Sequence, residues 1–232
     1  MKIKCVWEHN GNDSLIYVEN FTGAFTRGPR KEIALSKMQN EIDRYLKWVG
    51  EPTGETQIEI VQEKQSDLAI CDADSDVLFD SEMGALTKEK YERLKALALK
   101  SAEDFFSLYN SIPDKDLGDV GYKKTFYGKV PSTANEIYSH TKGVNSYYFA
   151  EIGIEADFVG DICEIRKKGF ALLEEMPDFL SGKVFDGSYG EKWTVKKVLR
   201  RFIWHDRIHA KALYRMARRL FGEDKISNPF FF

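Results

Sequence analysis

The chain has 232 residues, of which 43% are hydrophobic and 31% are charged. This composition is typical of a folded chain with one or two compact units, and it excludes a fully disordered chain. Lys and Arg number 34 against 37 Asp and Glu, which gives a formal charge of −3. Because dedicated nucleic-acid-binding proteins carry a large basic excess, we expect no nucleic-acid partner.

We expect a cytoplasmic protein with no membrane segment. No run approaches the roughly 18 apolar residues of a membrane-spanning helix. The N-terminal sequence MKIKCVWEHNGND turns polar by residue 8, unlike a signal peptide. Cys5, Cys71 and Cys163 are odd in number and form no C-x-x-C pair, which favours reduced thiols over a disulfide or zinc framework.

Residues 1–64 predict a small ββαβ domain. Residues 2–7 and 15–25 are rich in β-branched and aromatic side chains and flank a turn-forming segment, a pattern typical of a β-hairpin. Residues 30–49 predict an amphipathic helix, because apolar side chains recur at helical spacing at Ile33, Met38, Ile42, Leu46 and Val49. The alternating residues 56–61 then close the unit as a strand.

The segment YVENFTGAFTRGPRKEIALSKMQNEIDRYLKW resembles the HicB-like small α/β module. The resemblance lies in the hairpin, in the turn from Gly23 to Gly28 and in the helix that follows. The alternative is that this N-terminal segment is a structural appendage that packs on the main domain.

Residues 65–85 form an acidic linker, for which we expect a solvated connector. Asp72, Asp74 and Asp76 have the first spacings of a calcium loop. Such a loop needs Gly at its sixth position and Glu at its twelfth, where this chain has Val77 and Met83. The sequence therefore does not predict a calcium site here.

From residue 86 onward, apolar residues keep a helical period of about 3.6 residues. Four amphipathic helices are predicted, over residues 86–113, from Pro131-Ser132-Thr133 onward, over 161–180 and over 194–222. Thr133 and Glu136 have capping-box spacing, and Trp193 and Val198 have the spacing of a hydrophobic staple. A long loop with Gly118, Gly121 and Gly128 separates the first two helices. The fold class is mainly α, a four-helix bundle over 86–222 followed by a tail, 223–232.

Three of the four histidines fall on the predicted inward faces of helices. His205 and His209 are one helical turn apart, in a stripe formed by Val198, Phe202, His205, His209, Ala212 and Met216. His140 follows the same rule on the second helix, in line with Ile137, Val144 and Tyr147. A polar side chain that points into a helical bundle costs free energy of folding unless it has a hydrogen-bond partner or binds an ion.

Three neutral imidazoles from two helices predict a divalent metal site. Such a site leaves one or more coordination positions free, as catalytic sites do. Zinc, nickel, iron(II), cobalt and copper all accept histidine, so the metal is not identified. The alternative is that each of the three histidines is an ordinary core residue that is hydrogen-bonded to its neighbours.

The segments VPSTANEIYSHTKGVNSYYF and WTVKKVLRRFIWHDRIHAKALYR resemble the DinB-like (bacillithiol-transferase-like) family of metal-binding four-helix bundles. That family has one His in its second helix and H-x-x-x-H in its last, which His140, His205 and His209 match. The resemblance implies a metal-dependent enzyme, a thiol-dependent transferase or a hydrolase, acting on a small-molecule thiol or an electrophilic substrate. It also implies a homodimer. The chain departs from the family pattern after His209, where it has Ala-Lys-Ala, and this leaves the substrate class open.

Asp206 follows the first histidine of H-x-x-x-H, where H-E-x-x-H peptidases place their general base, and is the candidate catalytic carboxylate. The alternative is a surface carboxylate paired with Arg207 or Lys211. A peptidase also needs a third ligand downstream, and no later histidine exists. Four aromatic residues flank the histidines as candidate pocket or core side chains: Tyr138, Tyr147, Tyr148 and Trp204.

Two other functions stay open. The last helix carries many Lys and Arg residues, which we expect on its solvated face, opposite the histidines; a nucleic-acid-binding helix is the disfavoured interpretation. The chain could also be a non-enzymatic metal-binding or stress-response module. The terminal Phe230, Phe231 and Phe232 are expected to dock, either on the bundle or on a second subunit.

Overall fold

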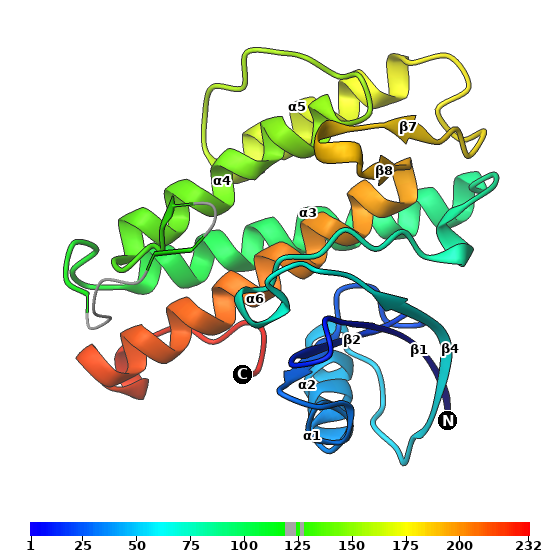
Figure 1. The fold of residues 1–232 in the computed structure, drawn as a ribbon. Coiled ribbons are helices and arrows are strands. Elements are labelled where there is room, and N and C mark those ends of the chain that lie inside the picture. Colours follow the sequence, from blue (N-terminus) through cyan, green and yellow to red (C-terminus); the bar gives the residue numbers. More distant parts are fainter. Residues whose placement is uncertain (119–123, 126–127) are drawn as a thin grey trace.

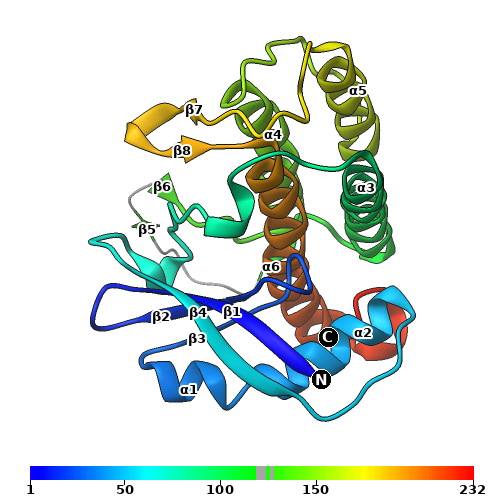
Figure 2. The same cartoon turned by 90° about the vertical axis from the view of Figure 1, so that its right-hand side faces the viewer.

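The computed structural model describes residues 1–118, 124–125 and 128–232. A four-stranded sheet with two helices lies against a region of four long helices (Figure 1, Figure 2). In the described part of the chain, no helix has the length and apolarity needed to cross a membrane.

The sheet is mixed and has the strand order β3-β2-β1-β4. It consists of β1 (Lys2–His9), β2 (Ser14–Val18), β3 (Phe25–Gly28) and β4 (Gln57–Gln65). β2 runs antiparallel to both β1 and β3, whereas β4 runs parallel to β1. A parallel pair needs a crossover connection, and the helices between β3 and β4 supply it.

The N-terminal part has one strand more than the ββαβ order predicted from sequence. The predicted second strand, 15–25, ends at Val18, and the chain reverses so that Phe25 pairs with Tyr17. Gly23 lies in this reversal with φ +94°, which glycine adopts without strain. A Cβ at this position would also lie 2.3 Å from Cγ2 of Ile203, so the turn is packed against the helical region.

The predicted helix over 30–49 is two helices, α1 (Lys31–Leu35) and α2 (Met38–Val49). The Ser36 hydroxyl at the break donates a hydrogen bond to the Ile33 carbonyl, an interaction that competes with a continuous helix. The break turns Ile33 outward, 37% exposed, whereas Met38, Ile42 and Leu46 on α2 are buried as predicted and Val49 is half-buried.

The acidic segment after β4 is not the solvated connector predicted from sequence. It contains the short 3-10 helices η1 (Ile70–Asp72) and η2 (Asp80–Glu82). Ile70, Val77 and Phe79 are buried in a cluster with residues of the sheet and with Trp204. The sequence reasoning missed this apolar set because its members lie in two short runs, 68–71 and 77–79, within a segment rich in Asp.

The helical region contains α3 (Lys88–Ser111), α4 (Ala134–Ala150), α5 (Ile162–Glu175) and α6 (Val195–Phe221). α3 and α4 each contact both α5 and α6. Two short hairpins complete it, β5 (Lys124–Thr125) with β6 (Gly128–Lys129) and β7 (Phe185–Asp186) with β8 (Lys192–Trp193). Two further 3-10 helices are η3 (Ser188–Gly190) and η4 (Glu223–Lys225). Of the predicted loop glycines, Gly121 lies outside the described residues.

One apolar core runs through both parts of the molecule, since Ile42 of α2 belongs to the same buried cluster as Phe105 and Phe202. The C-terminal tail docks on its own chain: Phe230 is fully buried and its ring lies 5.3 Å from that of Trp48. Phe231 stays 49% exposed.

Candidate metal centre

The two histidines of H-x-x-x-H lie on α6, the helix between the sheet and the other helices (Figure 1, Figure 2). The helix starts at Thr194, whose hydroxyl accepts a hydrogen bond from the Lys197 amide. One turn separates His205 from His209, about 6 Å along the axis. Their rings converge, with the two Nε2 atoms 3.1 Å apart.

His140 comes to the same point from α4. The helix begins at the predicted capping box, in which Thr133 and Glu136 bond each other's backbone. The ring centroid of His140 lies 5.1 Å from that of His205 and 4.6 Å from that of His209. One nitrogen from each ring can be chosen so that all three lie within 4.8 Å of one another.

The histidines differ in exposure, which corrects part of the stripe predicted from sequence. His205 is buried and His209 half-buried, as an inward face predicts, but Ala212 of the same stripe is exposed. His140 is also exposed, because the buried side of α4 is formed by other residues, Ala134, Ile137, Thr141, Asn145, Tyr148 and Phe149. The cluster therefore reaches solvent on the side of His140.

The surroundings keep the three imidazoles neutral. Burial, reinforced by the neighbouring His209 and His140, lowers the pKa of His205 well below its ordinary value. Burial, together with His140 and Arg27, lowers the pKa of His209 to about 3. Desolvation of the enclosed part of its ring also lowers the pKa of His140, although the residue as a whole is exposed. Neutral imidazole is the form that binds a metal ion, so the environment prepares all three rings as ligands.

The histidines fit a divalent transition metal by their donor atoms and by their spacing. Tetrahedral coordination at about 2.0–2.1 Å places ligand nitrogens about 3.3 Å apart, close to the separation between the Nε2 atoms of His205 and His209. In the part of the chain that the structure describes, this is the one group of three or more His, Cys, Asp or Glu side chains placed to share an ion.

Asp206, the candidate catalytic carboxylate, points away from the histidines into the interior of the helical region. It is fully buried and ion-pairs with Arg166 of α5, with N···O distances of 2.5 and 3.1 Å. The Ser101 hydroxyl of α3 donates to it as well. The alternative of a surface carboxylate paired with Arg207 or Lys211 is therefore wrong, and the geometry gives Asp206 a structural role.

The network around Asp206 contains residues that the sequence reasoning missed. Arg166 donates to the carboxylate, to the Asn145 side chain and to the Ala98 carbonyl. The sequence pattern could have identified Arg166 as a buried residue, because it lies one turn from Ile162 and from Phe170 on the apolar stripe of its helix. Like the histidines, Arg166 is a polar residue in an otherwise apolar stripe, where its side chain needs a partner.

The four flanking aromatic residues divide into two pairs. Tyr148 and Trp204 are buried beside His205, with ring-centroid separations of 5.9 and 6.4 Å. Tyr138 stacks on Tyr109 and accepts a hydrogen bond from a backbone amide of α5, and Tyr147 packs edge-on against Trp193. Tyr148 and Trp204 thus form the apolar wall behind the buried histidine.

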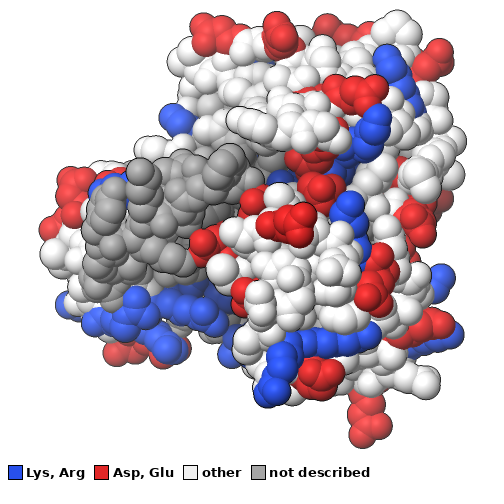
Figure 3. Space-filling view, in the orientation of Figure 1, with Lys and Arg blue, Asp and Glu red and all other residues white. Residues whose placement is uncertain are grey.

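Four of the nine basic residues of α6 do not lie on the solvated face predicted from sequence, whereas Arg215, Arg218 and Arg219 are exposed as predicted. Lys197, Arg200, Arg201 and Arg207 are all buried, because the sheet and its connector cover this side of the helix. Arg207 pairs with Glu41, and Arg200 pairs with Glu82. On the face drawn in Figure 3, acidic and basic side chains are interspersed.

Comparisons of this chain with protein-family models, with curated proteins and with solved structures found no match.

Proposed function

We propose that this chain is a metal-dependent enzyme in which His140, His205 and His209 hold one divalent transition metal ion, zinc, nickel or iron. The observation that carries the proposal is the convergence of three neutral imidazoles from α4 and α6, with nitrogens within 4.8 Å of one another. A three-histidine site leaves coordination positions free for water or substrate, which is the arrangement of catalytic sites.

The reaction class that we propose is thiol-dependent transfer or hydrolysis, with a small-molecule thiol and an electrophilic substrate. A metal ion bound here would supply Lewis acidity, lowering the pKa of a thiol or water toward neutrality. The residues of the chain hold and orient the ligands. Tyr148 and Trp204 shield His205 from water, while the exposed His140 lies on the side from which a substrate enters.

The fold that we propose is the DinB-like bundle, with the HicB-like module as an N-terminal addition. The order of the four helices and the positions of the three histidines support it. The homodimer implied by the same resemblance is part of the proposal and is tested by light scattering coupled to size exclusion. A non-enzymatic metal-binding module is the second candidate, because Asp206, the candidate catalytic carboxylate, is engaged in an ion pair with Arg166.

The test is metal content by elemental analysis of protein purified without a histidine tag. We expect about one transition metal ion per chain in the wild type, and its loss in His209→Ala and His140→Ala. His9→Ala is the matched control, since His9 lies on β1, where its ring bonds Glu63. Loss of metal in the control variant, or retention in both others, would refute the site.

The reaction is tested by metal-dependent conjugation of a low-molecular-weight thiol to an activated aryl halide. Activity that appears with the metal and is absent from His209→Ala supports the enzyme. Stoichiometric metal without thiol transfer or hydrolysis favours the non-enzymatic module.

A further inference from the structure

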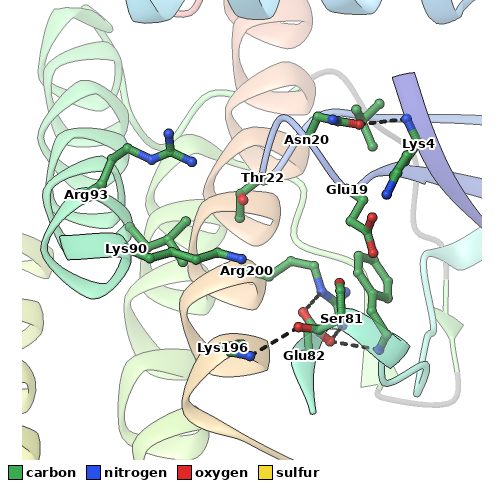
Figure 4. A pocket seen from close by; sticks show the side chains of 13 residues that line it. Lys4, Glu19, Asn20, Thr22, Ser81, Glu82, Lys90, Arg93, Lys196 and Arg200 are labelled. Atoms are coloured by element: carbon green, nitrogen blue, oxygen red, sulfur yellow. Dashed lines mark hydrogen bonds and ion pairs between the residues drawn. The ribbon is translucent and has the colours of Figure 1, made fainter. Parts of the chain in front are cut away.

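A second feature lies apart from the histidines, in a cavity of about 320 Å³ between the sheet, η2, α3 and α6 (Figure 4). Its cationic side chains come from three separate parts of the chain: Lys4 of β1, Lys90 and Arg93 of α3, and Lys196 and Arg200 of α6. Two carboxylates, Glu19 and Glu82, also line it, so the lining carries a net charge of +3.

Most of this positive charge is not neutralised within the protein. Arg200 pairs with Glu82, and Lys196 donates to the Ser81 and Met83 carbonyls. The Lys4, Lys90 and Arg93 side chains have no ion-pair or hydrogen-bond partner among the described residues. Burial and then the nearby Lys90 ammonium lower the pKa of Lys196, and the Glu82 carboxylate offsets this effect only in part.

Arg200, in the wall of the cavity, has only part of its hydrogen-bonding capacity satisfied within the protein. Arg200 is 3% exposed, and its Nη1 has no hydrogen-bond partner, although Nε and Nη2 are bonded to Glu82 and the Val77 carbonyl. A buried, charged donor without an acceptor is costly, so the groups around the Arg200 guanidinium compensate it only in part. Hydroxyl groups of Thr22 and Ser81 lie in the same lining.

We propose that this cavity binds a small phosphate-bearing metabolite with at least two negative charges. Ammonium and guanidinium groups from two helices, with hydroxyl donors between them, suit the several acceptor oxygens of a phosphate group. The volume lies at the lower end of small-molecule sites, about 300–1,000 Å³, which favours a small ligand. Val18, Phe79 and Leu94 offer an apolar wall for its uncharged part.

This inference does not rest on the metal centre, since none of the three histidines lines the cavity. A ligand here would bridge the sheet and the helical region, because Lys4 belongs to one and Lys90 to the other. Binding would therefore tighten the contact between the two parts of the molecule.

The test is isothermal titration of the full chain with pyrophosphate, and with citrate at the same ionic strength. We expect saturable binding of one pyrophosphate, with affinity reduced about tenfold or more in Lys90→Met and in Arg93→Met. Both residues are exposed, so these variants should fold. Lys88→Met is the matched control, because Lys88 lies on the same helix, is exposed and does not line the cavity.

Unchanged affinity in Lys88→Met, together with weaker binding of citrate, supports the proposal. Absence of pyrophosphate binding would overturn it. Equal weakening in all three variants would also overturn it, since that result reports the general charge of the surface. Citrate binding as tightly as pyrophosphate would contradict the assignment to phosphate.

Discussion

Glu41→Gln tests the contribution of the buried ion pairs between Glu41 of α2 and two basic residues of α6, Arg207 and Lys211. The carboxylate is 4% exposed and accepts hydrogen bonds from Arg207, at 2.9 Å, and from Lys211, at 2.7 Å. Arg207 is fully buried, and its Nε and Nη1 have no other hydrogen-bond partner. Its guanidinium lies among aromatic rings, with centroids 4.8 to 5.8 Å away, those of Tyr45, Trp48, Phe230 and Phe232.

The substitution removes the charge that compensates this buried guanidinium. Breaking a buried ion pair by removing one partner costs about 3–5 kcal/mol, and 1 kcal/mol corresponds to about 2–4 °C in a chain of this size. We therefore expect Tm to fall by about 6–20 °C in differential scanning calorimetry. Glu59→Gln is the control, because its pair with Lys2 is exposed and should contribute at most about 1 kcal/mol.

The pH dependence supplies a second measurement on the same variant. Burial opposes ionisation of Glu41, but Arg207 and Lys211 outweigh it and hold its pKa below its ordinary value of 4.5. Its contribution to stability is then present above pH 4.5 and is lost as the pH falls further. The stability difference between the wild type and Glu41→Gln should shrink below that pH.

The double variant Glu41→Gln with Arg207→Met should be more stable than Glu41→Gln alone. A single variant within about 1 kcal/mol of the wild type would refute the reasoning.

Three further predictions concern packing and charge. In Gly169→Ala the new Cβ would lie 2.0 Å from a ring carbon of Phe149, so chemical denaturation should show that the free energy of unfolding falls by about 1–3 kcal/mol. In the control Gly143→Ala the new Cβ has no atom within 4 Å, and the free energy of unfolding should rise by up to about 1 kcal/mol. Equal effects of the two substitutions would contradict the described packing. Phe230→Ala should cost about 3–5 kcal/mol, whereas the exposed Phe231→Ala should stay within about 0.5 kcal/mol; similar losses would show that the tail is not docked as described. Burial, partly offset by Glu191, lowers the pKa of Lys197 from 10.5 to about 8, so between these values the unfolded chain binds a proton that the folded chain lacks. The stability of the wild type relative to Lys197→Met should therefore rise from pH 8 to pH 10.5 in urea titrations, and a fall would contradict the burial of this lysine.

Local signals in the sequence predicted the helices and the convergence of the histidines. The Thr133 and Thr194 caps start α4 and α6 where predicted, because capping depends on a few adjacent residues. The spacing of His205 and His209 likewise fixes their relative position by helix geometry alone. The exposure of His140 was not predictable in this way, since it depends on which neighbouring helices cover α4.

The charged interior of α6 was missed because its partners are remote in sequence. Arg207 and Glu41 are 166 residues apart, and Arg200 and Glu82 are 118 residues apart. A basic helix considered by itself predicts a solvated face. These side chains are buried because the sheet and its connector pack against α6. That tertiary contact cannot be inferred from the composition of the helix.

The most direct test of the central claim is an anomalous-diffraction measurement on crystals of the protein loaded with zinc. We expect one anomalous peak, bonded to a ring nitrogen of each of His140, His205 and His209 at about 2.0–2.1 Å. A peak bonded to other residues, or the absence of any peak between these rings, would contradict it.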